Sequence, residues 1–349
     1  MSRLDEALTL VSISSVSRNE TELAAHVEGR LRAVDHLDVE RVGDNVIARS
    51  TGHHATRVLV AGHLDTVPGD ARAATIVEGQ LRGVGACDMK GSLAVMLAIA
   101  TDPTPRSIEV TWIFYAREEI TRSESGLSEI AELRPDLLQG DVALLAEPTG
   151  GQVEAGCQGT LKVSVQLAGF RAHAARPFTG RNAIHRLADV IALVAAYEPR
   201  VVDIEGVQYT EQLQAVGVEG GIAPNVVPDL ATLTINHRVA PDRSKEQAAS
   251  WLREYLGSSI EEDDKFSVLD WAPGALPSLG NERLSDLVRL TGHPAEGKVG
   301  WTDVATFQEL GVPATNFGAG DPLLAHRSDE FVTLDELTEF EDVLKEWLA

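Results

Sequence analysis

Hydrophobic and polar positions follow two different periods along this chain, and the periods indicate which segments are helices and which are strands. Helical segments have apolar residues every three to four positions, whereas strands have apolar runs or strict alternation. In the first 150 residues the predicted helices are 4–14, 22–34, 91–100 and 126–133. The predicted strands are 45–50, 57–68, 108–116 and 141–148. Apolar strands that alternate with helices predict an α/β layout, with a sheet covered on both faces.

The pattern changes in the middle of the chain. Strand-like segments at 161–169, 212–221 and 231–240 are combined with two amphipathic helices, at 182–198 and 245–256. Ser244 and Gln247 form a capping box that opens the second helix. Strands with two helices on one face predict a compact α+β module.

The α/β pattern then returns, with a strand at 312–317 and a closing helix at 334–348 that Thr333 and Glu336 cap. We therefore predict one mixed-sheet domain, formed by residues 1–156 and 274–349, interrupted by an inserted α+β domain at 157–273. Both joints are rich in glycine or proline, as linkers between domains often are.

Composition narrows the classes of function. The formal net charge of −23 disfavours nucleic acid and anionic membranes as partners. The two cysteines cannot form a disulfide framework, and there is no signal-peptide pattern and no apolar run of about 18 residues. We expect a cytoplasmic protein that binds a small molecule. An anionic substrate would need local positive charge, from arginine or from metal ions.

Side chains that can bind metal follow the predicted strands. In an α/β sheet, ligands bind beyond the carboxyl ends of the strands. The polar residues that follow apolar runs are His63, Asp65, Asp88, Glu118, Glu119, Glu147 and His326. Two imidazoles and several carboxylates suit zinc or a similar divalent ion, and two ions about 3.5–4 Å apart would use all of them.

Each of these residues also has an ordinary structural interpretation. His63 alone is compatible with a hydrogen-bonded strand-end histidine, and Asp65 with a turn residue before Pro68. Glu147 before Pro148 is compatible with a solvated turn, and His326 with an exposed loop. The coincidence of all of them at strand exits favours metal binding.

The adjacent pair Glu118 and Glu119 has an interpretation within such a centre. Successive residues that leave a strand point in different directions. Glu119 can therefore bind metal while Glu118 faces the reacting water as a general base. Asp65, two residues after His63, is predicted to hold the second imidazole nitrogen of that histidine.

Several motifs together resemble the di-zinc amidohydrolases, the family that includes aminoacylases and succinyl-diaminopimelate desuccinylases. The matching pieces are HLDTVP, GACDMKGSLAVML, EE, AEPT, GFRAHAARP, GGIAPNVVP and LLAHRSDE, in the order of the family. The resemblance implies that His63 and Glu147 bind one zinc ion and Glu119 and His326 the other. Asp88 would bridge the two ions, with a cis peptide bond after it, and cobalt would be able to substitute for zinc.

The same resemblance implies that residues 157–273 form a dimerisation lid. His173 would reach the active site of the partner subunit, and Asn225 and Arg238 would contact substrate. Gly300 and Thr302 are further candidate substrate contacts. Considered alone, His173 is more often a surface residue and Asn225 a turn residue. Arg238 fits a surface strand residue equally well, and Thr302 is compatible with a helix cap.

Within the family, segments such as EAGCQGTLKV and GDPLLAHRSDE are most similar to the actinobacterial type of succinyl-diaminopimelate desuccinylase. The expected reaction is removal of succinate from N-succinyl-LL-2,6-diaminopimelate, in lysine and diaminopimelate synthesis, by a homodimer. Two alternatives stay open: a deacylase of another N-acyl amino acid, such as acetylornithine, and a non-catalytic member of the family that binds or regulates.

Overall fold

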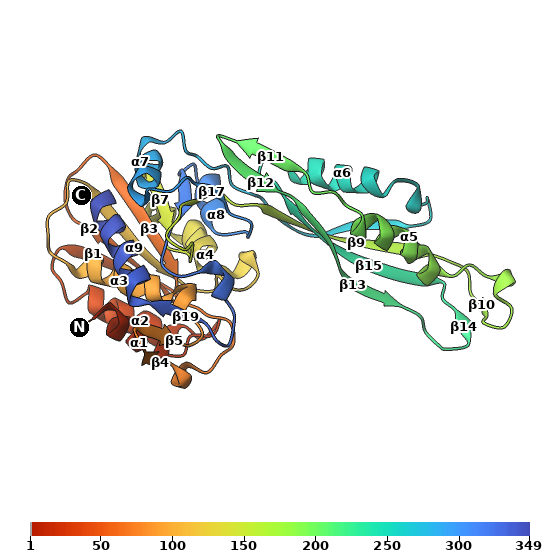
Figure 1. Cartoon of the computed structure of the whole chain (residues 1–349), viewed down its shortest axis with the longest axis horizontal. Helices are drawn as coiled ribbons and strands as arrows, with labels where there is room; N and C mark the ends of the chain where they lie inside the picture. The colour runs from red at the N-terminus through yellow and green to blue at the C-terminus, as the bar shows by residue number, and fades with distance from the viewer. Residues whose placement is uncertain (1) are drawn as a thin grey trace. The chain divides into compact units, whose positions relative to one another are not determined.

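The computed structural model describes residues 2–349, so the first residue of the predicted range 1–156 lies outside the described part. The chain forms two compact units (Figure 1). The first unit extends to Gly156 and also includes Pro277–Glu296 and Thr302–Ala349. The second unit comprises Cys157–Leu276 and Gly297–Trp301.

The first unit is built on an eight-stranded mixed sheet. The strand order is β1 (Leu37–Val42), β2 (Asn45–Ser50), β6 (Glu109–Tyr115), β3 (Arg57–His63), β7 (Val142–Leu145), β18 (Ala314–Asn316), β8 (Glu154–Ala155) and β17 (Glu296–Gly297). Strands β6, β3, β7 and β18 are parallel neighbours, whereas β2 and β8 pair antiparallel. Every residue of β6 is buried, so both faces of the sheet are covered there, as the apolar runs predict.

Seven α-helices belong to this unit within the described residues. They are α1 (Arg3–Ser12), α2 (Thr21–Leu31), α3 (Gly91–Thr101), α4 (Gly126–Leu133), α7 (Glu282–Thr291), α8 (Val304–Glu309) and α9 (Leu334–Trp347). Helix α3 packs against α1, α2 and α9, while α8 packs on β7 and β18. A small sheet of β4 (Thr75–Val77), β5 (Gln80–Arg82) and β19 (Phe331–Thr333) completes the unit.

The second unit has a four-stranded antiparallel sheet in the order β13 (Gln212–Gly220), β15 (Leu230–Val239), β9 (Gly159–Ala168) and β16 (Lys265–Ala272). Burial alternates along β9 and β15. The buried residues form one cluster with the apolar side chains of α5 (Ala183–Ala195) and α6 (Lys245–Leu256), so both helices cover the same face. Two short ribbons extend the unit: β10 (Ala172–His173) with β14 (Val226–Val227), and β11 (Val201–Ile204) with β12 (Val207–Thr210).

Most predicted elements are present, and both capping boxes, Ser244–Gln247 and Thr333–Glu336, are confirmed. Among the longer elements, the pattern of residues missed β1, β16 and α7, and it also missed most of the two- to four-residue strands. It assigned residues 274–276 to the first unit, and likewise the segment Gly297–Trp301. That segment packs with the second unit because Lys298 O accepts a hydrogen bond from Gln158 N at 3.1 Å and Trp301 Nε1 donates to Pro273 O at 3.0 Å.

None of the helices in residues 2–349 is both long and apolar enough to cross a membrane. The role of the second unit as a dimerisation lid stays a prediction.

Candidate metal centre

The candidate side chains gather because three strand exits coincide at one edge of the large sheet. His63 ends β3 and lies opposite Tyr115, the last residue of the parallel strand β6. Glu118 and Glu119 come just after Ala116 and Arg117 at the exit of β6, and Glu147 comes after β7, the other neighbour of β3. The pattern of strand ends therefore predicted this grouping correctly, because parallel neighbours bring their carboxyl ends together.

Asp88 lies at the middle of the cluster. Its Oδ1 is 3.0 Å from Nε2 of His63, and its Oδ2 is 3.5 Å from Nε2 of His326. Nε2 of His326 is also 2.8 Å from Oε1 of Glu119. One carboxylate thus faces two different imidazoles, one through each oxygen, as a bridging ligand would.

The polypeptide around Asp88 is fixed by a carboxylate from the far end of the chain. Glu330 Oε1 accepts hydrogen bonds from the backbone nitrogens of Cys87 and Asp88, at 2.8 and 2.9 Å. The peptide bond between Asp88 and Met89 is cis, as the resemblance implies. Glu330 is 1% exposed, and burial raises its pKa to about 7.

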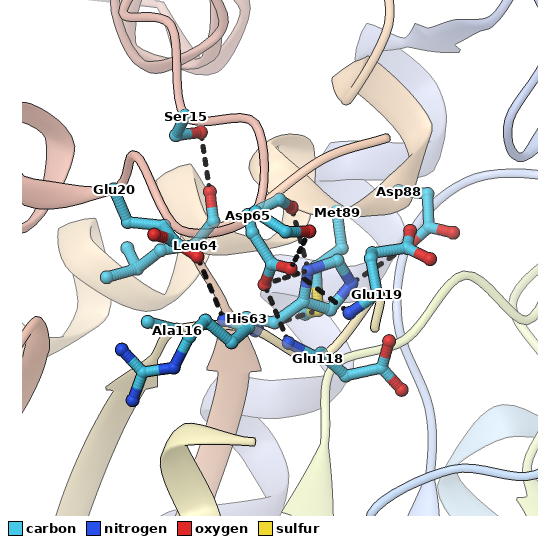
Figure 2. Close-up of polar contacts among 12 residues, drawn as sticks. Ser15, Glu20, His63, Leu64, Asp65, Asp88, Met89, Ala116, Glu118 and Glu119 are labelled. Carbon is cyan, nitrogen blue, oxygen red and sulfur yellow. Dashed lines mark hydrogen bonds and ion pairs between the residues drawn. The ribbon is translucent and has the colours of Figure 1, made fainter. Parts of the chain in front are cut away.

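The contact that orients His63 differs from the predicted one. Nδ1 of His63 lies 2.9 Å from the backbone carbonyl oxygen of Asp65, and the carboxylate Oδ1 is further away, at 3.6 Å. The Asp65 carboxylate instead accepts from the backbone nitrogens of Glu118 and Glu119, at 2.9 and 3.0 Å (Figure 2). Asp65 therefore holds both the histidine and the glutamate pair.

The electrostatics fit a divalent cation. Burial lowers the pKa of His63, but hydrogen bonds to Asp65 and Asp88 and the charge of Glu147 raise it well above its usual value. Hydrogen bonds to Asp88 and Glu119 raise the pKa of His326 to about 10. A field of carboxylates that favours positive charge on both imidazoles also attracts metal ions, and nitrogen and carboxylate oxygen are ligands that zinc prefers.

The innermost group is His63, Asp88 and Glu119, whose potential ligand atoms all lie within 4.8 Å of one another. Around it, His326 contacts two members, and Glu147, 6% exposed, is close enough to influence His63. These donors fit a centre of one or more divalent ions.

Glu118 differs from its neighbour, as the prediction requires. Figure 2 shows the two side chains leaving the backbone in different directions, with that of Glu119 toward Asp88. Desolvation of the Glu118 carboxyl and the charge of Glu147 raise the pKa of Glu118 well above its usual value. The geometry gives one glutamate to the ligand group and leaves the other outside it.

The remaining candidates are not among these strand-end side chains. In the second unit, His173 is exposed on β10, and Asn225 is beside it, since Ala174 N donates to Asn225 O at 2.9 Å. Arg238 lies on β15 opposite Gln212 and Thr160, and burial lowers its pKa. Gly300 is also in this unit.

Thr302 belongs to the first unit and is 4% exposed. Its hydroxyl donates to Asn316 Oδ1 at 2.9 Å. The helix that follows begins after Asp303, whose carboxylate accepts from Thr306 and Ser125 rather than from a helix nitrogen. A role for Thr302 in substrate binding stays a prediction.

The sequence pattern did not single out Ser17, Glu20 or Glu330 for the site. Ser17 Oγ donates to Asp65 Oδ2 at 2.7 Å, and Glu20 Oε1 accepts from Arg117 N at 3.0 Å. Glu330 is part of the same LLAHRSDE segment as His326, and this proximity in sequence is a signal that could have identified it. Nothing in the periodicity marks Ser17 or Glu20. Their contacts join residues 48 and 97 positions apart and depend on the path of the backbone.

Three comparisons with known proteins add to this geometry. Residues 59–349 match the family model described as Peptidase family M20/M25/M40. A Mycobacterium tuberculosis protein provisionally named succinyl-diaminopimelate desuccinylase DapE is 44% identical over 342 residues, which cover 97% of this chain and 96% of that protein. The succinyl-diaminopimelate desuccinylase of Corynebacterium glutamicum is 42% identical over 347 residues, covering 97% and 94%.

Solved structures resemble the whole fold. Aminopeptidase PepT of Bacillus cereus has a TM-score of 0.80 at 20% identity, with 99% of this chain and 97% of that chain covered. The YXEP protein of Bacillus subtilis, described as a dinuclear metal binding peptidase from the M20 family, has a TM-score of 0.74 at 16% identity, with 99% and 96% covered. At these identities the likeness concerns the fold.

Proposed function

The chain belongs to peptidase family M20/M25/M40, and on that premise we propose that it is a metal-dependent hydrolase that removes succinate from N-succinyl-LL-2,6-diaminopimelate. The observation that carries the proposal is Asp88, which faces His63 and His326 through its two oxygens at the edge where Glu118 emerges. Two relatives named for this reaction are 42% and 44% identical over nearly the full chain. An acetylornithine deacetylase of Myxococcus xanthus is 26% identical.

The metal we propose is zinc, as two ions per subunit. His63 and Glu147 would hold one ion, Glu119 and His326 the other, with Asp88 shared between them. When bound, the ions supply Lewis acidity, which polarises a carbonyl and favours ionisation of water. Cobalt shares the preference of zinc for these nitrogen and oxygen ligands, so we expect it to substitute.

The side chains of the protein would then handle the protons. Glu118 accepts the proton of the attacking water and later delivers it to the nitrogen of the leaving amine. The Asp65 carboxylate keeps Glu118 in place, because its Oδ1 accepts a hydrogen bond from the backbone nitrogen of Glu118 at 2.9 Å. The products of the cleaved amide are succinate and diaminopimelate.

Substrate recognition requires positive charge, because the substrate carries three carboxylates and the chain has a net charge of −23. We propose that Arg238, which offers a bidentate contact, binds one carboxylate. Asn225, Gly300 and Thr302 are proposed as further contacts. The names of the Mycobacterium tuberculosis and Corynebacterium glutamicum relatives specify a small anionic acyl amino acid as substrate, which agrees with this assignment.

We propose that the protein works as a homodimer joined through the second unit. Strand β13 is at the edge of its sheet, and all but one of its residues are exposed. Val216 and Val218 are each 57% exposed. A long edge strand has backbone N–H and C=O groups that can pair with another strand. The same strand of a second copy would supply partners for them and cover the apolar side chains. Cys87 and Cys157 are both buried and are not joined in a disulfide, which agrees with a reducing compartment such as the cytoplasm.

Substrate preference separates the proposal from its alternatives. With zinc-loaded protein, we expect kcat/KM for N-succinyl-LL-2,6-diaminopimelate to exceed that for N-acetylornithine by about 10²-fold or more. The reason is that an acetyl group lacks the terminal carboxylate of succinyl, so the protein group that pairs with this carboxylate would be left without a partner. The measurement is release of free amine from a panel of N-succinyl and N-acetyl amino acids. Preference for an acetyl substrate would favour the deacylase alternative, and binding without hydrolysis of any member the non-catalytic one.

A further inference from the structure

The backbone that carries Glu118 and Glu119 turns sharply just after β6. Arg117, between the strand and the glutamates, has a φ of +61°. This left-handed conformation is unfavourable for a residue with a Cβ, so it persists only where neighbouring groups hold it. The positions of both glutamates depend on this turn.

Three successive backbone nitrogens in the turn donate to two carboxylates. Arg117 N donates to Glu20 Oε1 at 3.0 Å, and the next two nitrogens donate to Asp65, at 2.9 and 3.0 Å. Figure 2 shows dashed lines running from both the Glu20 and the Asp65 carboxylates to the chain that leaves Ala116. Asp65 comes from the end of β3, whereas Glu20 comes from the N-terminal segment.

Glu20 does not behave as a typical acidic residue at the start of a helix. It occupies the N-cap position of α2, yet its side chain makes no capping hydrogen bond. Its Oε1 accepts from Arg18 N at 3.1 Å and from Arg117 N, and the residue is 0% exposed. Within residues 2–349 its Oε2 has no hydrogen-bond partner. A carboxylate buried at such cost calls for a reason beyond capping.

The segment that carries Glu20 is tied to the exit of β3. Ser15 Oγ donates to Leu64 O at 2.7 Å, and Thr66 N donates to Ser15 O at 3.0 Å. Ser17 Oγ donates to Asp65 Oδ2 at 2.7 Å. These bonds fix the N-terminal segment against the same strand that supplies His63, so Glu20 is a rigid support for the turn.

We propose that Glu20 is a positioning residue that sets the turn at Arg117 and thereby the placement of Glu118 and Glu119. The inference rests on the proposed function for its kinetic consequence. Its structural part, the support of the turn by an acceptor at Glu20, is independent of the substrate.

The test compares Glu20→Ala, Glu20→Asp and Glu20→Gln in the full-length metal-loaded protein. Aspartate is a good N-cap residue but is one methylene too short to reach Arg117, whereas glutamine keeps an Oε1 acceptor at the same reach. Glu22→Ala is the matched control, because Glu22 is an exposed acid in the first turn of the same helix.

The first measurement is hydrogen–deuterium exchange of the peptide that spans Arg117–Glu119, without substrate. We expect exchange to be about tenfold faster or more in the alanine and aspartate variants, and unchanged in Glu20→Gln and Glu22→Ala. Unchanged exchange in Glu20→Ala and Glu20→Asp would overturn the proposal, whatever reaction the protein catalyses. Should the alanine variant fail to fold, the aspartate variant alone decides.

The second measurement is kcat and KM for the proposed substrate. Misplacement of a reacting group by about 1 Å costs on the order of 10²-fold in rate, so kcat should fall by 10- to 100-fold in the alanine and aspartate variants, with KM little changed. Glu20→Gln should restore most of kcat. A kcat near that of the unsubstituted protein in Glu20→Asp, or a glutamine variant as impaired as alanine, would contradict the positioning role.

Discussion

Replacing Glu118 by glutamine is expected to lower kcat by about 10²–10⁴-fold while the protein keeps its full complement of metal. The substitution removes a proton acceptor but preserves the size of the side chain and the backbone nitrogen that Asp65 binds. Glu118 also lies outside the group formed by His63, Asp88 and Glu119. Steady-state kinetics and metal analysis of the same purified sample check both parts.

Glu119→Gln is the matched control for that experiment. Glu119 Oε1 is 2.8 Å from Nε2 of His326, and the residue belongs to the innermost ligand group. We therefore expect this variant to lose metal as well as activity. Near-normal turnover in Glu118→Gln, or full metal content in Glu119→Gln, would show that the two roles are assigned wrongly.

Mixing two inactive variants is expected to restore activity if His173 works across a dimer interface. His173→Ala and Glu118→Gln should each be impaired as homodimers, the former by about 10²–10³-fold, the usual cost of losing one donor to an oxyanion. A mixed dimer holds one site with both residues intact and one site with neither. Its activity should approach half that of a dimer of the unsubstituted chain.

The structure gives His173 the form that this role requires. Its Nδ1 accepts a hydrogen bond from Ala175 N at 3.1 Å, so the proton of the neutral ring is on Nε2, which is then a donor. The residue is exposed on β10, away from the buried cluster of its unit. Mixtures of either variant with itself are the controls. If subunit exchange is demonstrated and no activity returns, His173 does not act in the neighbouring subunit.

The strand-end cluster was predictable from sequence because its members share one simple cause. A buried parallel strand has a recognisable apolar run, and the residue that follows the run must lie at the carboxyl edge of the sheet. His63 ends such a run, and Glu119 and Glu147 come within a few residues of the end of one. Capping boxes were predictable for a similar reason, since Ser244 and Gln247 interact over three residues.

Contacts that depend on the path of the backbone could not be predicted in this way. Whether His63 would meet the carboxylate or the carbonyl of Asp65 is decided by the turn after β3. Glu20 has the sequence context of any acidic residue at a helix start, and its contact with Arg117 joins residues 97 positions apart. Strand β16 could not be recognised from an alternating pattern, because only its last residue is buried.

Zinc titration of the chelated protein tests the two-metal centre most directly. Metal content and hydrolysis of N-succinyl-LL-2,6-diaminopimelate are followed together as zinc is added. Because each proposed site has its own histidine, His63 or His326, the sites should differ in affinity and fill in two steps. We predict saturation at two equivalents per subunit, with activity rising as the ions bind. Saturation at a single equivalent with full activity would contradict the account.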